Sequence, residues 1–224
     1  MLERQAPADP AWQLDAGEWY TNPEGLSSWP LSASTGEGGD DDGCGGGSGG
    51  DSEASATDLL LMELAETGRE VTDAELRRIR EHVAGAGFAP GRRTKPGRRG
   101  VGKVFDGREL SSLDRLAAGE AHYVWHVLHS REWPEGTSYS DYIRSLSEVV
   151  RDPAAAVALT RHNNLLQASF LRRSGNLRGL GGHEWVLVEY RPVPGHVVTA
   201  YQPRPETYRE LERRVIRWLQ TPQW

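Results

Sequence analysis

The chain has 224 residues, of which 37% are hydrophobic, and a formal charge of −6, so it is poorer in apolar side chains than most single-domain proteins. No apolar run approaches the roughly 18 residues that cross a bilayer, and the first residues lack the cationic start and apolar stretch of a signal peptide. The one cysteine, Cys44, excludes an internal disulfide and a cysteine-based zinc site. We therefore expect no membrane partner, and a location either in the cytoplasm or outside it by a route that needs no signal peptide.

The charge is divided unevenly along the chain. Residues 1–57 carry eleven acids and one base, whereas residues 58–224 carry 21 acids and 25 bases, so the −6 is the sum of −10 and +4. Nine of the fifteen residues 36–50 are glycine. Such a composition buries too little apolar surface to offset the entropy of ordering. We predict a disordered acidic, glycine-rich tail over 1–57, which is either solvated or docks its aromatic residues on a partner or on the basic domain, and a single domain over 58–224.

The domain is predicted to begin with a helical extension and a basic loop, residues 58–103. A short apolar helix at 58–65 precedes a second helix, which opens at residues 72–75 with Thr-Asp-Ala-Glu, a capping box. Residues 90–103 then hold six positive charges, two prolines and no acid. This composition predicts a loop that attracts phosphate, with an ordinary solvated surface loop as the alternative. Its candidate RNA-binding residues are Arg92, Arg93, Lys95, Arg98 and Arg99.

The third predicted helix, residues 112–130, carries the strongest local signal for chemistry. His122, His126 and His129 share one face of it, with Arg115 near their centre as a further RNA-binding candidate. The apolar residues gather on the opposite face: Leu113, Leu116, Ala117, Val124, Val127 and Leu128. Imidazoles at this spacing suit acid–base catalysis, metal ligation or a solvated polar stripe, and the helical wheel alone does not choose among them.

The rest of the chain predicts a fourth helix, then strands, then a closing helix at 206–219. Four short segments with alternating or β-branched residues follow the fourth helix, at 156–161, 165–172, 184–191 and 197–201. Their short connections permit only antiparallel neighbours. We therefore predict an α+β fold, in which N-terminal helices pack on a four-stranded antiparallel meander and a C-terminal helix closes the domain over 204–224.

Two further features of the strands suggest contacts with phosphate. Strand alternation places the hydroxyls of Thr199 and Tyr201 on one face of the last strand, where they are either hydrogen-bond donors or structural residues with good β propensity. Arg161, at the end of the first strand, can hold a phosphate through two parallel hydrogen bonds or serve as a surface residue.

Residues 104–203 resemble the barnase–EndoU–colicin–RelE superfamily of small metal-independent ribonucleases, many of which are toxin domains. The resemblance rests on the helical half with Glu-Ala-His-Tyr at 120–123 and then His126, on the four-stranded meander, and on Val-Val-Thr-Ala-Tyr at 197–201. It implies a ribonuclease core without a cofactor, attack by the 2′-hydroxyl of RNA, and a cognate immunity or inhibitor protein. The catalytic residues it implies here are His122, His126, Arg161, Thr199 and Tyr201.

Two other functions are compatible with the same sequence. A metal-dependent hydrolase would use His122, His126 and His129 as ligands. A non-enzymatic module would bind nucleic acid through residues 90–103 or a protein through the aromatic tail. The RNA substrate, its cleavage site and the oligomeric state have no signal in the sequence.

Overall fold

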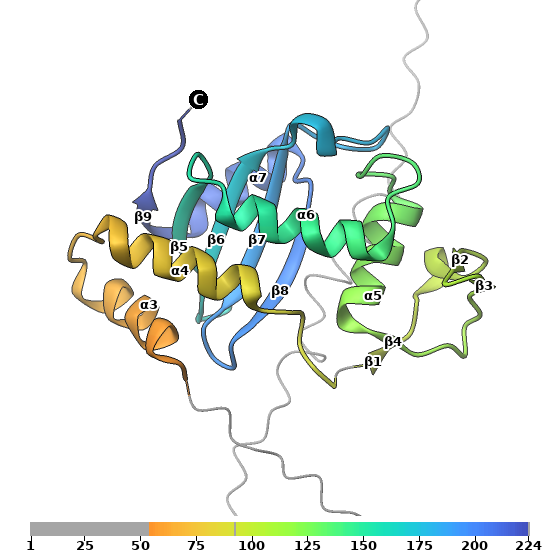
Figure 1. Ribbon diagram of the computed structural model, residues 1–224, viewed down its shortest axis with the longest axis horizontal. Coiled ribbons are helices and arrows are strands. Elements are labelled where there is room, and N and C mark those ends of the chain that lie inside the picture. The colour runs from red at the N-terminus through yellow and green to blue at the C-terminus, as the bar shows by residue number, and fades with distance from the viewer. Residues whose placement is uncertain (1–53, 92, 224) are drawn as a thin grey trace, which may run out of the picture. The chain divides into compact units, whose positions relative to one another are not determined.

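The computed structural model describes residues 54–91 and 93–223 of the chain (Figure 1). The predicted tail over 1–57 lies outside the described residues except for its last four positions, and Arg92 of the basic segment also lies outside them. The described residues form a mixed α/β structure built on an antiparallel sheet.

The main sheet has five strands rather than the four expected. In chain order they are β5 (Ala156–His162), β6 (Leu165–Arg173), β7 (Trp185–Arg191), β8 (His196–Tyr201) and β9 (Val215–Gln220). Their order across the sheet is β8-β7-β6-β5-β9, and every neighbouring pair is antiparallel. The strand β8, which carries Thr199 and Tyr201, is therefore at one edge.

The predicted closing helix over 206–219 is wrong in its second half. The helix α7 covers Pro205–Arg214, and the chain then continues directly as β9, which pairs with β5. The residues Val215, Ile216 and Trp218 have high β propensity, and the edge of β5 offers backbone groups that need partners. Tertiary pairing thus overrides the helical spacing of the apolar residues.

Three longer helices accompany the sheet. They are α3 (Ala56–Thr67), α4 (Asp73–Gly85) and α6 (Tyr139–Arg151). Figure 1 shows α6 across one face of the sheet, in contact with β6 and β7, and α4 beside α6. Both N-terminal helices begin with a capping box, Ser55 with Asp58 and Thr72 with Glu75. The second of these was predicted from the sequence.

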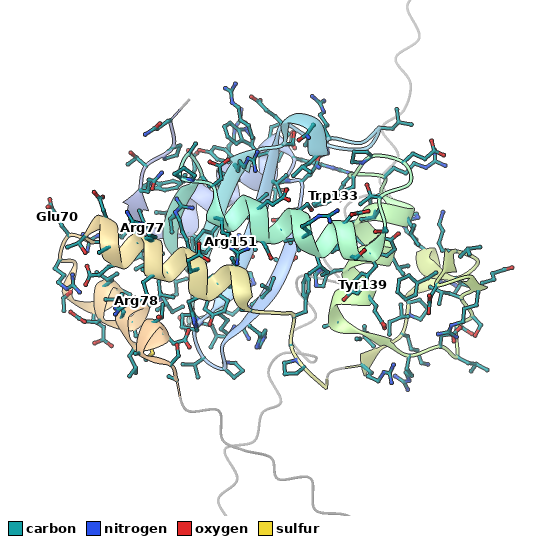
Figure 2. The ribbon with its side chains drawn as sticks, viewed as in Figure 1. Glu70, Arg77, Arg78, Trp133, Tyr139 and Arg151 are labelled. Atoms are coloured by element: carbon teal, nitrogen blue, oxygen red, sulfur yellow. The ribbon has the colours of Figure 1, made fainter. Side chains whose placement is uncertain are left out.

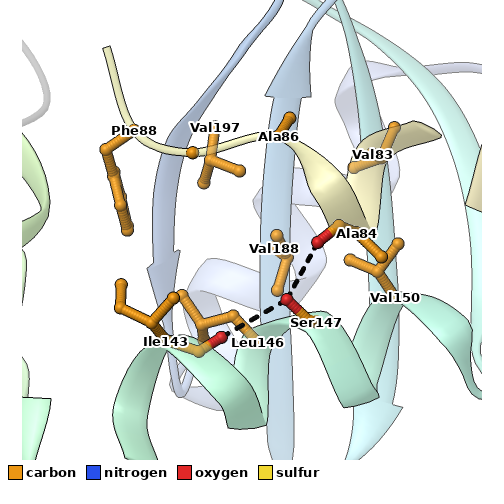
Figure 3. A pocket seen from close by; sticks show the side chains of 11 residues that line it. Val83, Ala84, Ala86, Phe88, Ile143, Leu146, Ser147, Val150, Val188 and Val197 are labelled. Carbon is orange, nitrogen blue, oxygen red and sulfur yellow. Dashed lines mark hydrogen bonds between the residues drawn. The ribbon is translucent and has the colours of Figure 1, made fainter. Parts of the chain in front are cut away.

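Side chains fill the space between α6 and the sheet. Trp133 is buried and donates its indole N–H to the Ser145 hydroxyl at 3.1 Å (Figure 2). A cavity of about 30 Å³ lies between α4, α6 and β7, lined almost entirely by apolar residues, and Ser147 donates to the Ala84 carbonyl beside it (Figure 3). With room for one or two water molecules, it is a packing defect rather than a ligand site.

The third helix is shorter than predicted and is not uniform. It consists of α5 (Ala118–Tyr123) followed by a π-helix, η2 (Val124–His129). The preceding residues leave the helix: β4 (Leu116–Ala117) pairs with β1 (Arg93–Thr94). Between them lies a second small hairpin of β2 (Val104–Phe105) and β3 (Arg108–Glu109). The helix can begin at residue 118 because the Glu120 carboxylate accepts from the Ala117 N–H at 2.7 Å.

Candidate functional site

The candidate site lies where the π-helix η2 meets the edge strand β8. The ring of His126 lies 5.8 Å from the ring of Tyr201, with 22° between their planes. His126 is only 3% exposed. The alternative that the histidines form a solvated stripe on the helix is therefore wrong for His126. The structure thus brings together one predicted imidazole and one predicted hydroxyl residue that are 75 positions apart in the chain.

A buried carboxylate holds the inner histidine in place. Nδ1 of His126 lies 2.8 Å from Oε1 of Glu132, and Oε2 of Glu132 accepts the backbone N–H of Gln202 at 2.7 Å. Because a carboxylate only accepts hydrogen bonds, Nδ1 is the donor, and the neutral ring has its lone pair on Nε2. The resulting pair is the arrangement that fixes the tautomer and orientation of a general base. Glu132 was not predicted as a site residue. The only signal in the sequence is that an acidic residue follows His126 by six positions.

A glycine-rich loop fixes the position of that carboxylate. The N–H groups of Gly179 and Gly181 donate to the carbonyls of Glu132 and Arg131, at 2.6 and 2.9 Å. A Cβ atom on Gly181 would overlap the carbonyl oxygen of Ser130, so only glycine allows this approach. The loop connects β6 and β7, and it also braces the turn that carries Glu132.

The second histidine extends the stack outward. The ring of His122 lies 5.7 Å from that of His126 and 4.7 Å from that of Phe88, with 14° and 23° between the planes. Phe88, His122, His126 and Tyr201 therefore form a column of rings, which we call the ring column. His122 is half-buried and His126 buried, so His122 is the more accessible of the two imidazoles.

The third histidine leaves this column because of the π-helix. Hydrogen bonds from i to i+5 make each turn longer than 3.6 residues, so the residue three positions after His126 no longer shares its face. His129 instead contacts the ring of Trp125 at 5.2 Å. Burial, then the charges of Arg99 and Lys103, lower its pKa. Within residues 54–91 and 93–223, no group of three His, Cys, Asp or Glu side chains could hold one metal ion, so the alternative ligand set receives no support.

The basic segment, residues 90–103, packs against the same helix. The guanidinium of Arg99 lies 5.6 Å from the ring centre of Trp125 in η2, a cation–π distance. The side chains of Arg93, Lys95 and Arg98 are exposed. Positive charge is therefore carried beside the helix that bears the histidines.

Two of the predicted site residues lie elsewhere. Arg115 is exposed and precedes β4, so it does not share a helical face with the histidines. Arg161 is on β5, three strands from β8 or roughly 14 Å across the sheet. Strand register places it on the sheet face opposite Thr199 and Tyr201. Neither residue contributes to the ring column, and the expected phosphate clamp at Arg161 is not formed with it.

Thr199 belongs to a buried polar row on the face that Tyr201 shares. It is 3% exposed and pairs across the sheet with Glu189. Burial raises the pKa of the Glu189 carboxyl, and the nearby Arg214, whose guanidinium is 3.3 Å away, opposes that rise. Thr199 therefore lies beside the Glu189 carboxyl group, and it precedes Tyr201 by two residues on the same strand.

Comparisons with protein-family models, with curated proteins and with solved structures give no match for this chain. Among the helices of the described residues, none has the length and apolar character to span a bilayer.

Proposed function

We propose that this protein is a metal-independent ribonuclease that cleaves RNA at the ring column. The observation that carries the proposal is the geometry of His126: its Nδ1 is fixed by the buried Glu132 carboxylate, and its ring stacks on Tyr201 at the sheet edge. A histidine oriented in this way by a carboxylate suits proton transfer near neutral pH.

The proposed reaction uses the two histidines as base and acid. Nε2 of His126 removes the proton of a ribose 2′-hydroxyl, and the oxygen attacks the adjacent phosphorus. The bond from phosphorus to the 5′-oxygen breaks, and that oxygen takes a proton from the imidazolium of His122. The products are a 2′,3′-cyclic phosphate and a 5′-hydroxyl, and no metal or other co-reactant enters the balance. The hydroxyl of Tyr201 would donate to the phosphate oxygens, where negative charge develops. The donation expected of Thr199 would first require it to become accessible, since it is 3% exposed.

The basic segment supports the choice of RNA as substrate. Its exposed cations Arg93, Lys95 and Arg98 are on the chain that packs against α5 and η2, where they would attract a polyanion in a salt-dependent manner. An acidic inhibitor protein would compete with RNA for the same positive charges. We therefore also propose that such an inhibitor is a partner of this protein.

The test is cleavage of a labelled single-stranded RNA with EDTA present. The proposal predicts cleavage that the chelator leaves unchanged, with 2′,3′-cyclic phosphate and 5′-hydroxyl ends. Loss of cleavage on chelation, or 3′-hydroxyl ends, would instead indicate a metal-dependent hydrolase. Binding without any cleavage by the full chain would indicate a non-enzymatic module.

A further inference from the structure

An open groove of about 470 Å³ lies outside the ring column, between α7 and the start of β7. Its volume falls within the range of small-molecule sites. The residues that line it are Arg178, His183, Glu184, Trp185, Pro203, Pro205, Tyr208, Arg209 and Glu212. Two aromatic rings and two arginines in one groove are the side-chain types that bind single-stranded nucleic acid.

The two aromatic rings of the groove lie close to parallel, slightly closer together than a base stacked between them would require. The centres of the Trp185 and Tyr208 rings lie 6.5 Å apart, with 25° between the planes. Successive stacked bases are about 3.4 Å apart, so a base held between two rings needs roughly 7 Å between the ring planes. The two side chains would have to separate by at least about 0.5 Å to admit one. The guanidinium of Arg173, which does not line the groove, lies 5.3 Å from the Trp185 ring centre, a cation–π distance.

The groove lining carries two arginines that can contact an anionic ligand and two carboxylates that balance their formal charge. Glu184 lies 3.5 Å from the guanidinium of Arg173, which offsets its charge, whereas Glu212 accepts the hydroxyl hydrogen of the neutral Tyr208 at 2.8 Å and keeps its negative charge. For Arg178 and Arg209, no ion pair with a carboxylate occurs within the described residues. Arg178 donates its Nε–H to the Gly182 carbonyl, which orients its guanidinium beside the groove.

The groove is connected to the ring column through one residue, Gln202. Its side-chain oxygen accepts the backbone N–H of His183 at 3.0 Å, and its backbone N–H donates to the Glu132 carboxylate at 2.7 Å. Gln202 follows Tyr201 directly and precedes Pro203, which lines the groove. The groove therefore begins directly after the end of β8, where Tyr201 of the ring column lies.

We infer that this groove is a base-binding subsite for single-stranded RNA: one unpaired base stacks between Trp185 and Tyr208, and Arg178 and Arg209 contact its phosphates. The inference rests on the proposed function for the identity of the ligand as RNA. It adds that the substrate is single-stranded, because a base paired in a duplex cannot enter between two rings.

The test measures binding without cleavage. The probe is a fluorescein-labelled single-stranded RNA decamer with 2′-O-methyl groups, which lacks the attacking hydroxyl, and the readout is Kd from fluorescence anisotropy with the full chain. We expect Trp185→Ala and Tyr208→Ala each to raise Kd about 5- to 150-fold, the range measured for loss of one stacked base. Trp185→Phe and Tyr208→Phe keep a ring and should stay within about threefold of wild type.

The controls separate stacking from charge and from folding. Arg209→Gln should raise Kd and reduce its salt dependence, whereas Arg77→Gln, which removes one exposed charge from α4 (Figure 2), should do neither. An unchanged Kd in both alanine variants, or equal binding of the same decamer as a duplex, would overturn the inference. If wild-type protein binds the decamer through these residues but cleaves no RNA, the proposed ribonuclease function is overturned. The groove would then still be a binding site for single-stranded RNA.

Discussion

Replacing Glu132 by glutamine tests the proposed role of the carboxylate with almost no change in shape. In wild type, its two oxygens accept from Nδ1 of His126 and from the Gln202 N–H. A glutamine has one carbonyl oxygen and one NH₂ group. If the oxygen keeps the Gln202 contact, the NH₂ faces Nδ1, and His126 must change to the tautomer that has its proton on Nε2. That ring can no longer act as a base through Nε2.

The structure gives two different magnitudes for this variant. Each hydrogen bond to the buried carboxylate is charge-assisted, so E132Q should lower the free energy of unfolding by about 1–3 kcal/mol. A general base in the wrong tautomer should cost cleavage about 10²- to 10⁴-fold. The loss of activity should therefore persist at temperatures where the variant is fully folded. The matched control is Glu135→Gln, since Glu135 is exposed three residues further along.

Two measurements on E132Q separate tautomer from folding. Single-turnover cleavage rates give the catalytic effect, and ¹⁵N chemical shifts of the His126 ring report which nitrogen is protonated. We expect Nδ1–H in wild type and Nε2–H in E132Q. A folded E132Q variant with the Nε2–H tautomer and wild-type cleavage would exclude His126 as the base. A wild-type His126 ring protonated only on Nε2 would exclude the proposed role of Glu132.

Three further changes test the surrounding structure. Arg80 is buried and donates to two backbone carbonyls, so R80M should lower the free energy of unfolding by about 2–4 kcal/mol in urea titrations; a loss below 0.5 kcal/mol would contradict this. Hydrogen bonds from Arg69, then from the helix cap, lower the pKa of Glu75 to about 2. Its contribution is thus present above pH 4.5 and lost as pH falls towards 2, and E75Q should lose less thermal stability than wild type between pH 5 and pH 3. Gly181 packs on the carbonyl of Ser130, so G181A should displace the Glu132 turn and reduce cleavage at least tenfold, whereas G85A, at the end of α4 where an added Cβ meets no other atom within 4 Å, should not.

The sequence predicted elements whose signals are local. The second helix follows from its Thr72–Glu75 capping box, and the strands from alternation between turn residues. It did not predict β9, because Val215 and Trp218 also fit a helical stripe, and only the available edge of β5 makes them a strand. Local propensity is weak beside tertiary pairing of this kind.

The candidate site was predictable only in part, for a geometrical reason. A wheel at 100° per residue places His122, His126 and His129 together, but the π-helix changes the rotation and removes His129. The approach of His126 to Tyr201 depends on where β8 lies in the sheet. The contact of His126 with Glu132 depends on a turn that the glycine loop holds. Neither is encoded in local spacing.

The rate at which the full-length His126→Ala variant cleaves single-stranded RNA in EDTA tests the central claim most directly. We expect a loss of about 100-fold or more relative to wild type, while the His129→Ala variant, which changes the histidine outside the ring column, stays within about threefold. Circular dichroism on both variants shows that they are folded. Cleavage by folded H126A at the wild-type rate would exclude His126 as the base.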